Sequence, residues 1–154
     1  MKPRVAILGR HADGTLRDVK VHNLPTSEYV VAIRFDGSLY FANVSYFEDA
    51  VLEAATSHPK AKHILVVGDG INALDASGEE VIHHLVERLH DNGVTLLFSG
   101  LKKQVLDIME ATGLRQIIGA GNIFPTEDMA LDAIARRVFE EDPGAEICLL
   151  KPAT

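Results

Sequence analysis

The chain has 154 residues, of which 47% are hydrophobic and 24% are charged, and this balance predicts a single folded domain over residues 1–154. Its formal net charge of -7 argues against a nucleic-acid partner, because neutralising phosphates requires clustered lysine and arginine. No apolar run reaches the roughly 18 residues of a membrane-spanning helix. The single cysteine, Cys148, can form no disulfide within the chain, which fits a reducing cytoplasm.

The first part of the chain has extended patterns. The apolar residues 5–8 predict a strand, and the polar stretch 11–27 predicts a loop. Residues 30–41 contain two extended runs on either side of Asp36-Gly37, which is a turn signal, and they predict a β-hairpin.

From Val44 onward, helical and extended patterns alternate. Four helices are predicted from apolar residues at helical spacing: Val44, Phe47, Val51 and Ala54 in the first, Val81, Leu85 and Leu89 in the second, Val105, Ile108 and Met109 in the third, and Met129, Ala133, Ile134 and Val138 in the fourth. Strands are predicted at residues 64–67, 94–98 and 116–118, and at 147–150 within a tail of residues 143–154. This order predicts an α/β fold with a mixed, mostly parallel sheet.

One polar stretch lies between a predicted buried strand and a predicted helix. Residues 69–78 read DGINALDASG, with an Asp, a small residue, a Ser and a Gly at the start of the helix. This stretch resembles the signature loop of STAS domains, which are shared by anti-sigma-factor antagonists and sulfate permeases. The resemblance places the signature on Asp69, Gly70, Asp75, Ser77 and Gly78.

Two further stretches resemble the sulfate permease branch of that family. Residues 34–43, RFDGSLYFAN, are similar to its hairpin-to-helix segment. Residues 4–10, followed by Arg17-Asp18, resemble the segment through which such a domain follows the last membrane helix. Residues 1–10 would then form a leading segment and first strand.

The resemblance implies a fold and a function. The expected fold is STAS-like, a central mixed sheet of about four to six strands with about four helices mainly on one face. The expected function is that of a regulatory and interaction domain, not an enzyme, at the cytoplasmic face of the membrane. A membrane domain of the same polypeptide would carry sulfate or a related anion and would be the main partner, with a cytoplasmic protein or a second copy as further partners.

Ser77 has two interpretations. Ser77 and Glu80 match a capping box, in which the serine hydroxyl accepts a hydrogen bond from the Glu80 amide. Ser77 is also the position that resembles the phosphorylated serine of the antagonists, and phosphate is favoured at a helix N-terminus. Capping is the favoured interpretation, because Glu79 and Glu80 would repel a phosphate.

A second turn adds an anion-site hypothesis. Ser99, Lys102 and Lys103 follow the next buried strand and would share the carboxyl edge of the sheet with the signature loop, where a partner or a small anion would bind. Two alternatives stay open: a free-standing anti-sigma-factor antagonist, and a nucleotide-binding domain that uses the glycines near Asp69. No Walker lysine follows those glycines, and no metal-ligand spacing is present, so no cofactor and no metal are expected.

Overall fold

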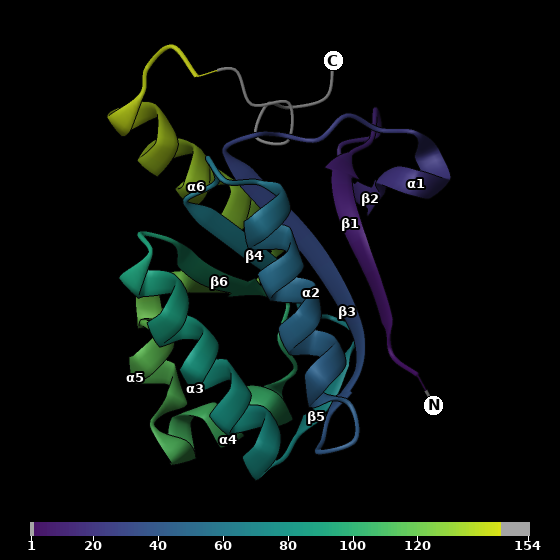
Figure 1. The fold of residues 1–154 in the computed structure, drawn as a ribbon, viewed down its shortest axis with the longest axis vertical. Helices are drawn as coiled ribbons and strands as arrows, with labels where there is room; N and C mark the ends of the chain where they lie inside the picture. Colours follow the sequence, from purple (N-terminus) through teal and green to yellow (C-terminus); the bar gives the residue numbers. More distant parts are fainter. Residues whose placement is uncertain (1, 146–154) are drawn as a thin grey trace.

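A mixed β-sheet forms the centre of the fold in the computed structural model, which describes residues 2–145 (Figure 1). The strands are β1 (Arg4–Arg10), β2 (Leu16–Asp18), β3 (Val30–Leu39), β4 (His63–Val67), β5 (Ile71–Leu74), β6 (Thr95–Ser99) and β7 (Ile123–Phe124). Their order is β2-β1-β3-β4-β6-β7, and β5 pairs with the far end of β3. Strands β3, β4, β6 and β7 are parallel neighbours, whereas β1 is antiparallel to both β2 and β3. The predicted mixed sheet is confirmed.

Helices cover both faces of the sheet. They are α1 (Val19–His22), α2 (Val44–Ser57), α3 (Ala76–Asp91), α4 (Lys103–Thr112), α5 (Leu114–Ile118) and α6 (Glu127–Glu141), with a 3-10 turn η1 (Ala120–Asn122). In Figure 1, α2 and α3 lie in front of the sheet and α6 lies behind it. The four long helices are the four that the apolar spacing predicts. Within residues 2–145, no helix combines the length and the apolar character needed to cross a bilayer.

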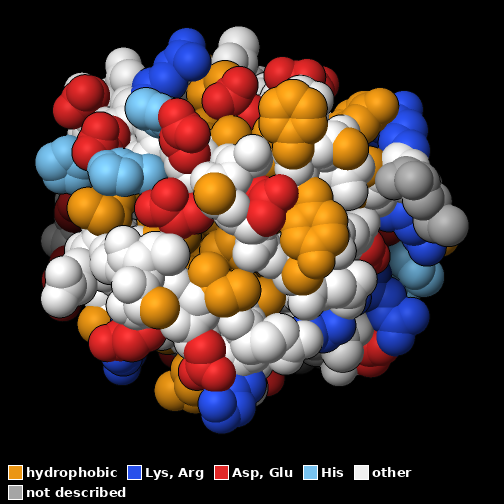
Figure 2. Space-filling model, turned by 90° about the horizontal axis from the view of Figure 1, so that it is seen from below, with side chains coloured by type: hydrophobic (Ala, Val, Ile, Leu, Met, Phe, Trp, Pro, Cys, Tyr) orange, Lys and Arg blue, Asp and Glu red, His pale blue; other side chains and the backbone are white. Residues whose placement is uncertain are grey.

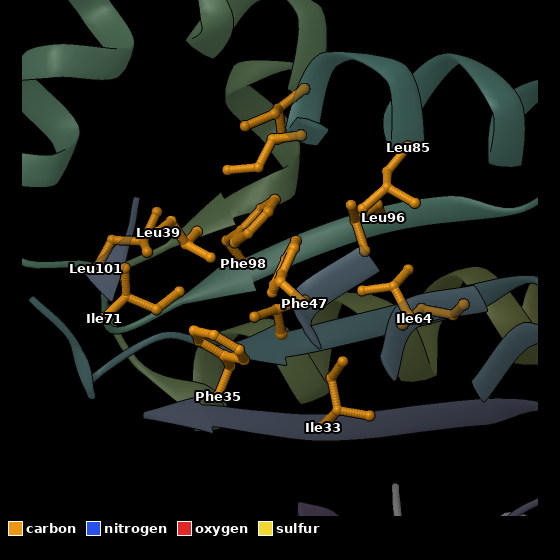
Figure 3. Close-up of a cluster of buried hydrophobic side chains, with 14 of the residues drawn as sticks. Ile33, Phe35, Leu39, Phe47, Ile64, Ile71, Leu85, Leu96, Phe98 and Leu101 are labelled. Atoms are coloured by element: carbon orange, nitrogen blue, oxygen red, sulfur yellow. The ribbon is translucent and has the colours of Figure 1, made fainter. Parts of the chain in front are cut away.

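Alternation along the strands creates two cores. On β3, Ile33 and Phe35 face α2 and α3, whereas Ala32 packs toward α6. The larger core lies on the α2 and α3 side, where the Phe35 and Phe47 rings meet edge to face with centroids 5.3 Å apart (Figure 3). Residues from α2, α3, β3, β4 and β6 interlock there, so the ends of these elements have fixed positions.

The predicted hairpin at residues 30–41 is wrong. Residues Val30–Leu39 form one continuous strand, β3, with neighbours on both sides. Asp36, at the expected turn, pairs with Arg4 of β1, and the Gly37 amide donates to the Gly70 carbonyl at 2.9 Å. Pairing with distant strands therefore satisfies the backbone groups that a local turn would have used.

Two other local predictions are wrong. Residues 116–118 belong to helix α5, where Leu114 and Ile118 are buried at four-residue spacing, and the last described strand is instead β7. The stretch 11–27, predicted as a loop, contains β2 and α1, and the Asp18 carboxylate caps α1 by accepting from the Lys20 amide at 2.8 Å. The tail strand at 147–150 lies outside the described residues.

Candidate functional site

The two turns that were expected at one edge of the sheet do meet there. The Gly68 amide donates to the Ser99 carbonyl at 2.8 Å, and the Lys102 ammonium donates to Asn72 Oδ1 at 2.5 Å. The Asp69 carboxylate lies against Gly100, where a β-carbon would collide with it. The signature loop and the turn after β6 are therefore one surface, as predicted.

Not every predicted residue of that edge is available to a ligand. Ser99 is fully buried, so its side chain does not reach solvent. The Lys103 ammonium points along its own helix and pairs with Asp107 at 2.7 Å. Of the three residues proposed for the edge, only Lys102 contacts the signature loop through its side chain.

A carboxylate lies beside the same loop. Burial raises the pKa of Glu127, at the start of α6, and the carboxylates of Asp128 and, less strongly, Asp69 raise it further. Among residues 2–145, no group of three metal-ligating side chains comes together. His83 and His84 instead contact Glu87 and Glu80 on the surface of α3.

Asp75, and not Ser77, caps helix α3, so the predicted capping box is wrong. Asp75 is the residue before the helix, and its Oδ1 accepts from the Gly78 amide at 3.0 Å. The reason is the register of β5: Leu74 pairs with Leu39, whose carbonyl accepts from the Asp75 amide at 3.2 Å. This pairing places Ser77 inside the first turn, where it is half-buried.

The Asp75 carboxylate also joins two elements. Its Oδ2 accepts from the backbone amide of Phe41, in the connection between β3 and α2, at 3.1 Å. One side chain thus satisfies an amide of the α3 N-terminus and an amide of a neighbouring loop. This arrangement gives Asp75 a structural role.

Replacing Asp75 by alanine should lower the free energy of unfolding by about 1–2 kcal/mol, because two amides lose their acceptor. Ser77→Ala, two residues along the same turn, should change it by less than about 0.5 kcal/mol. Chemical denaturation at a constant m-value measures both. If Ser77→Ala were the more destabilising change, the assignment of the cap to Asp75 would be wrong.

An exposed aromatic surface adjoins this turn and was not predicted from the sequence. Three side chains between the end of β3 and the first turn of α2 form it: Tyr40, Phe41 and Tyr46, with exposed fractions of 47%, 81% and 41%. Figure 1 shows that this connection lies at the lower end of the molecule, and Figure 2 shows hydrophobic side chains, aromatic rings among them, gathered on that face beside acidic ones. The sequence predicted an extended run that ends at Phe41, and an extended pattern alone does not show which of its aromatic side chains are exposed.

A buried histidine lies at the other end of the sheet. His63, the first residue of β4, is 6% exposed, and its Nδ1 has no partner among residues 2–145. Burial lowers the pKa of His63, and the nearby Arg137 guanidinium lowers it further. The folded domain therefore holds this imidazole neutral at pH values where the unfolded chain has begun to protonate it.

This burial predicts a pH dependence of stability. The unfolded chain takes up the proton near the ordinary value of about 6.5, so stability is complete above that pH and falls as the pH drops toward the folded pKa. His63→Leu should flatten the decline in unfolding midpoint between about pH 7.5 and about pH 5.5, whereas replacing the exposed His84 by asparagine should not. An unaltered slope in His63→Leu would contradict the assignment.

The comparisons with known proteins concern most of the chain. The model of the family described as "STAS domain" matches residues 22–130. The chain belongs to this family. High affinity sulfate transporter 2 of Stylosanthes hamata is 26% identical to the STAS chain over 146 residues, which are 87% of this chain and 22% of that protein. Sulfate transporter 1.3 of Arabidopsis thaliana is 24% identical over 91% of this chain and 23% of its own length. The STAS chain thus spans about a fifth of the curated relatives it matches.

Solved structures share the fold. The STAS domain of a SulP transporter from Vibrio cholerae superposes with a TM-score of 0.61 at 19% identity, covering 79% of this chain and 94% of that one. The murine anion transporter solute carrier 26 family member A9 gives a TM-score of 0.73 at 19% identity, covering 86% of this chain and 22% of that one. The anti-sigma-factor antagonist SpoIIAA gives 0.58 at 17% identity over 73% of this chain and 93% of that one. These likenesses confirm the STAS-like fold.

Proposed function

We propose that this STAS domain is the cytoplasmic regulatory and interaction domain of a sulfate-permease-like secondary anion transporter. A membrane domain of the same polypeptide would move sulfate or a related anion, and this domain would control its assembly or activity through surface contacts. The observation that carries the proposal is the match to sulfate transporters over 87% of the chain. The exposed aromatic surface next to the signature loop supports a role in binding.

The free-standing antagonist is the weaker alternative. Antagonist structures share the fold at 17–18% identity, which speaks for the fold alone. The curated sequence relatives are sulfate transporters, and this favours the transporter interpretation. Phosphorylation of Ser77 stays a prediction of that alternative.

The absence of catalysis also stays a prediction. Gly68, Asp69 and Gly70 lack the lysine of a phosphate-binding loop, and the Asp75 carboxylate is occupied by two backbone amides. The purified domain should hydrolyse neither ATP nor GTP above a buffer blank. Sustained hydrolysis that disappears in Asp69→Ala would overturn this expectation, because it would assign the activity to this loop and not to a contaminating enzyme.

Uptake of labelled sulfate by the whole polypeptide tests the proposed function. Cells that lack sulfate uptake should gain it on expression, and Ser77→Glu should change the rate at matched membrane abundance while shifting the unfolding midpoint of the domain only slightly. The small effect on folding is expected because the added charge meets the α3 dipole favourably but is repelled by Glu79 and Glu80. A polypeptide without membrane helices would refute the proposal.

A further inference from the structure

The surface formed by Tyr40, Phe41 and Tyr46, called the aromatic surface below, is held in a fixed shape. The Tyr40 carbonyl accepts from the amides of Asn43 and Val44 at 2.8 and 3.1 Å. The Asn43 side chain donates to the Ser38 carbonyl at 3.0 Å. With Phe41 tied to Asp75, the backbone beneath the three rings is ordered before any partner arrives, which lowers the entropy lost on binding.

Acidic side chains flank the aromatic surface. Asp49 is one helical turn beyond Tyr46 on α2. Glu79 lies in the first turn of α3, whose cap Asp75 contacts the Phe41 amide, and Glu80 follows it. Figure 2 shows acidic side chains next to the hydrophobic ones on this face. Asp75 and Glu79 already offset the positive end of the α3 dipole. The helix dipole therefore does not cancel the remaining carboxylates, and the surface presents an excess of negative charge.

The chain itself shows that this surface accepts a cation. The Lys2 ammonium lies 5.6 Å from the centroid of the Tyr46 ring, a cation–π contact. Lys2, Tyr46 and Asp49 also line a groove of about 510 Å³ between β1 and α2, which meets the aromatic surface at Tyr46. A surface of aromatic rings beside carboxylates thus favours the binding of a polypeptide segment that carries lysine or arginine together with apolar side chains.

We propose that the aromatic surface binds a lysine- or arginine-rich cytoplasmic loop of the transporter's own membrane domain. This inference rests on the proposed function. Cytoplasmic loops of membrane proteins carry an excess of lysine and arginine, which complements the acidic flank. Anionic lipid headgroups would be repelled by Asp49, Glu79 and Glu80, so the membrane surface itself is disfavoured as the occupant.

Photo-crosslinking in the whole polypeptide tests this contact. The photoreactive residue p-benzoylphenylalanine replaces Phe41, and a matched control replaces Val21, which is 72% exposed on α1 at the opposite end of the molecule (Figure 1). Mass spectrometry of membranes should locate the crosslink from position 41 on a lysine- or arginine-containing cytoplasmic loop, at several times the yield from position 21. Glu79→Lys should reduce that yield by charge repulsion. Because Glu79 also meets the positive end of the α3 dipole, the same change should lower the unfolding midpoint slightly.

The remaining outcomes would overturn the inference in distinguishable ways. Crosslinks from position 41 to a second copy, to lipid or to another protein, or a yield equal to that from position 21, would refute the contact while the proposed function stands. A native polypeptide with no membrane domain would refute both.

Discussion

Replacing Phe47 by alanine should lower the free energy of unfolding by about 3–5 kcal/mol, because truncating a fully buried aromatic leaves a cavity. Phe47 is the largest of three α2 side chains buried in the larger core, beside Val51 and Ala54, and its ring meets Phe35 edge to face (Figure 3). Such an aromatic pair adds about 0.5–1.5 kcal/mol beyond the area it buries.

The neighbouring residue supplies the control for Phe47. Tyr46 is 41% exposed on the same turn, and Tyr46→Ala should cost less than about 1 kcal/mol. Chemical unfolding monitored by circular dichroism measures both variants at a shared m-value. Equal losses in the two would show that α2 is not anchored to the sheet through Phe47.

Replacing Gly78 by alanine should cost about 3 kcal/mol, an unusually large effect for one added methyl group. Its β-carbon would overlap the Leu39 carbonyl oxygen and would lie 2.6 Å from Leu74 Cδ1. The Leu39 carbonyl cannot retreat without losing its hydrogen bond from the Asp75 amide. Gly78 therefore lets α3 begin directly against the end of β3.

A second glycine distinguishes this collision from a general effect of the substitution. Gly121 has no atom within 4 Å of an added β-carbon, so Gly121→Ala should change stability by less than about 0.5 kcal/mol. Thermal and chemical unfolding of the two variants should therefore differ clearly. A tolerated Gly78→Ala would mean that α3 packs less closely on β3 than described.

The long elements could be predicted because their signals are local. Helices such as α2 and α6 repeat apolar residues at helical spacing, and β4 and β6 are continuous apolar runs, so each pattern shows its own structure. The hairpin at Asp36-Gly37 failed because β1 and β5, both distant in sequence, take up the hydrogen bonds of β3. Sequence spacing carries no information about such pairing.

The sequence predicted which turns form the site, but not which residue has which role in it. The signature loop and the turn after β6 were placed together correctly, because carboxyl ends of parallel strands share an edge. The register of β5 against β3 decides which residue caps α3, and the sequence does not show that register. The cap is therefore Asp75 and not the predicted Ser77. The exposure of Phe41 depends on where β3 ends, which the extended pattern of residues 30–41 did not show.

The most direct test of the central claim is the size and location of the native protein. An antibody raised against this 16.8 kDa domain should detect, in the cells that encode it, one polypeptide several times larger, since the chain spans about a fifth of its curated relatives. That polypeptide should stay in the membrane fraction through high-salt washing and should be released by detergent. A band near the mass of the domain in the fraction that remains after membranes are removed would contradict the account.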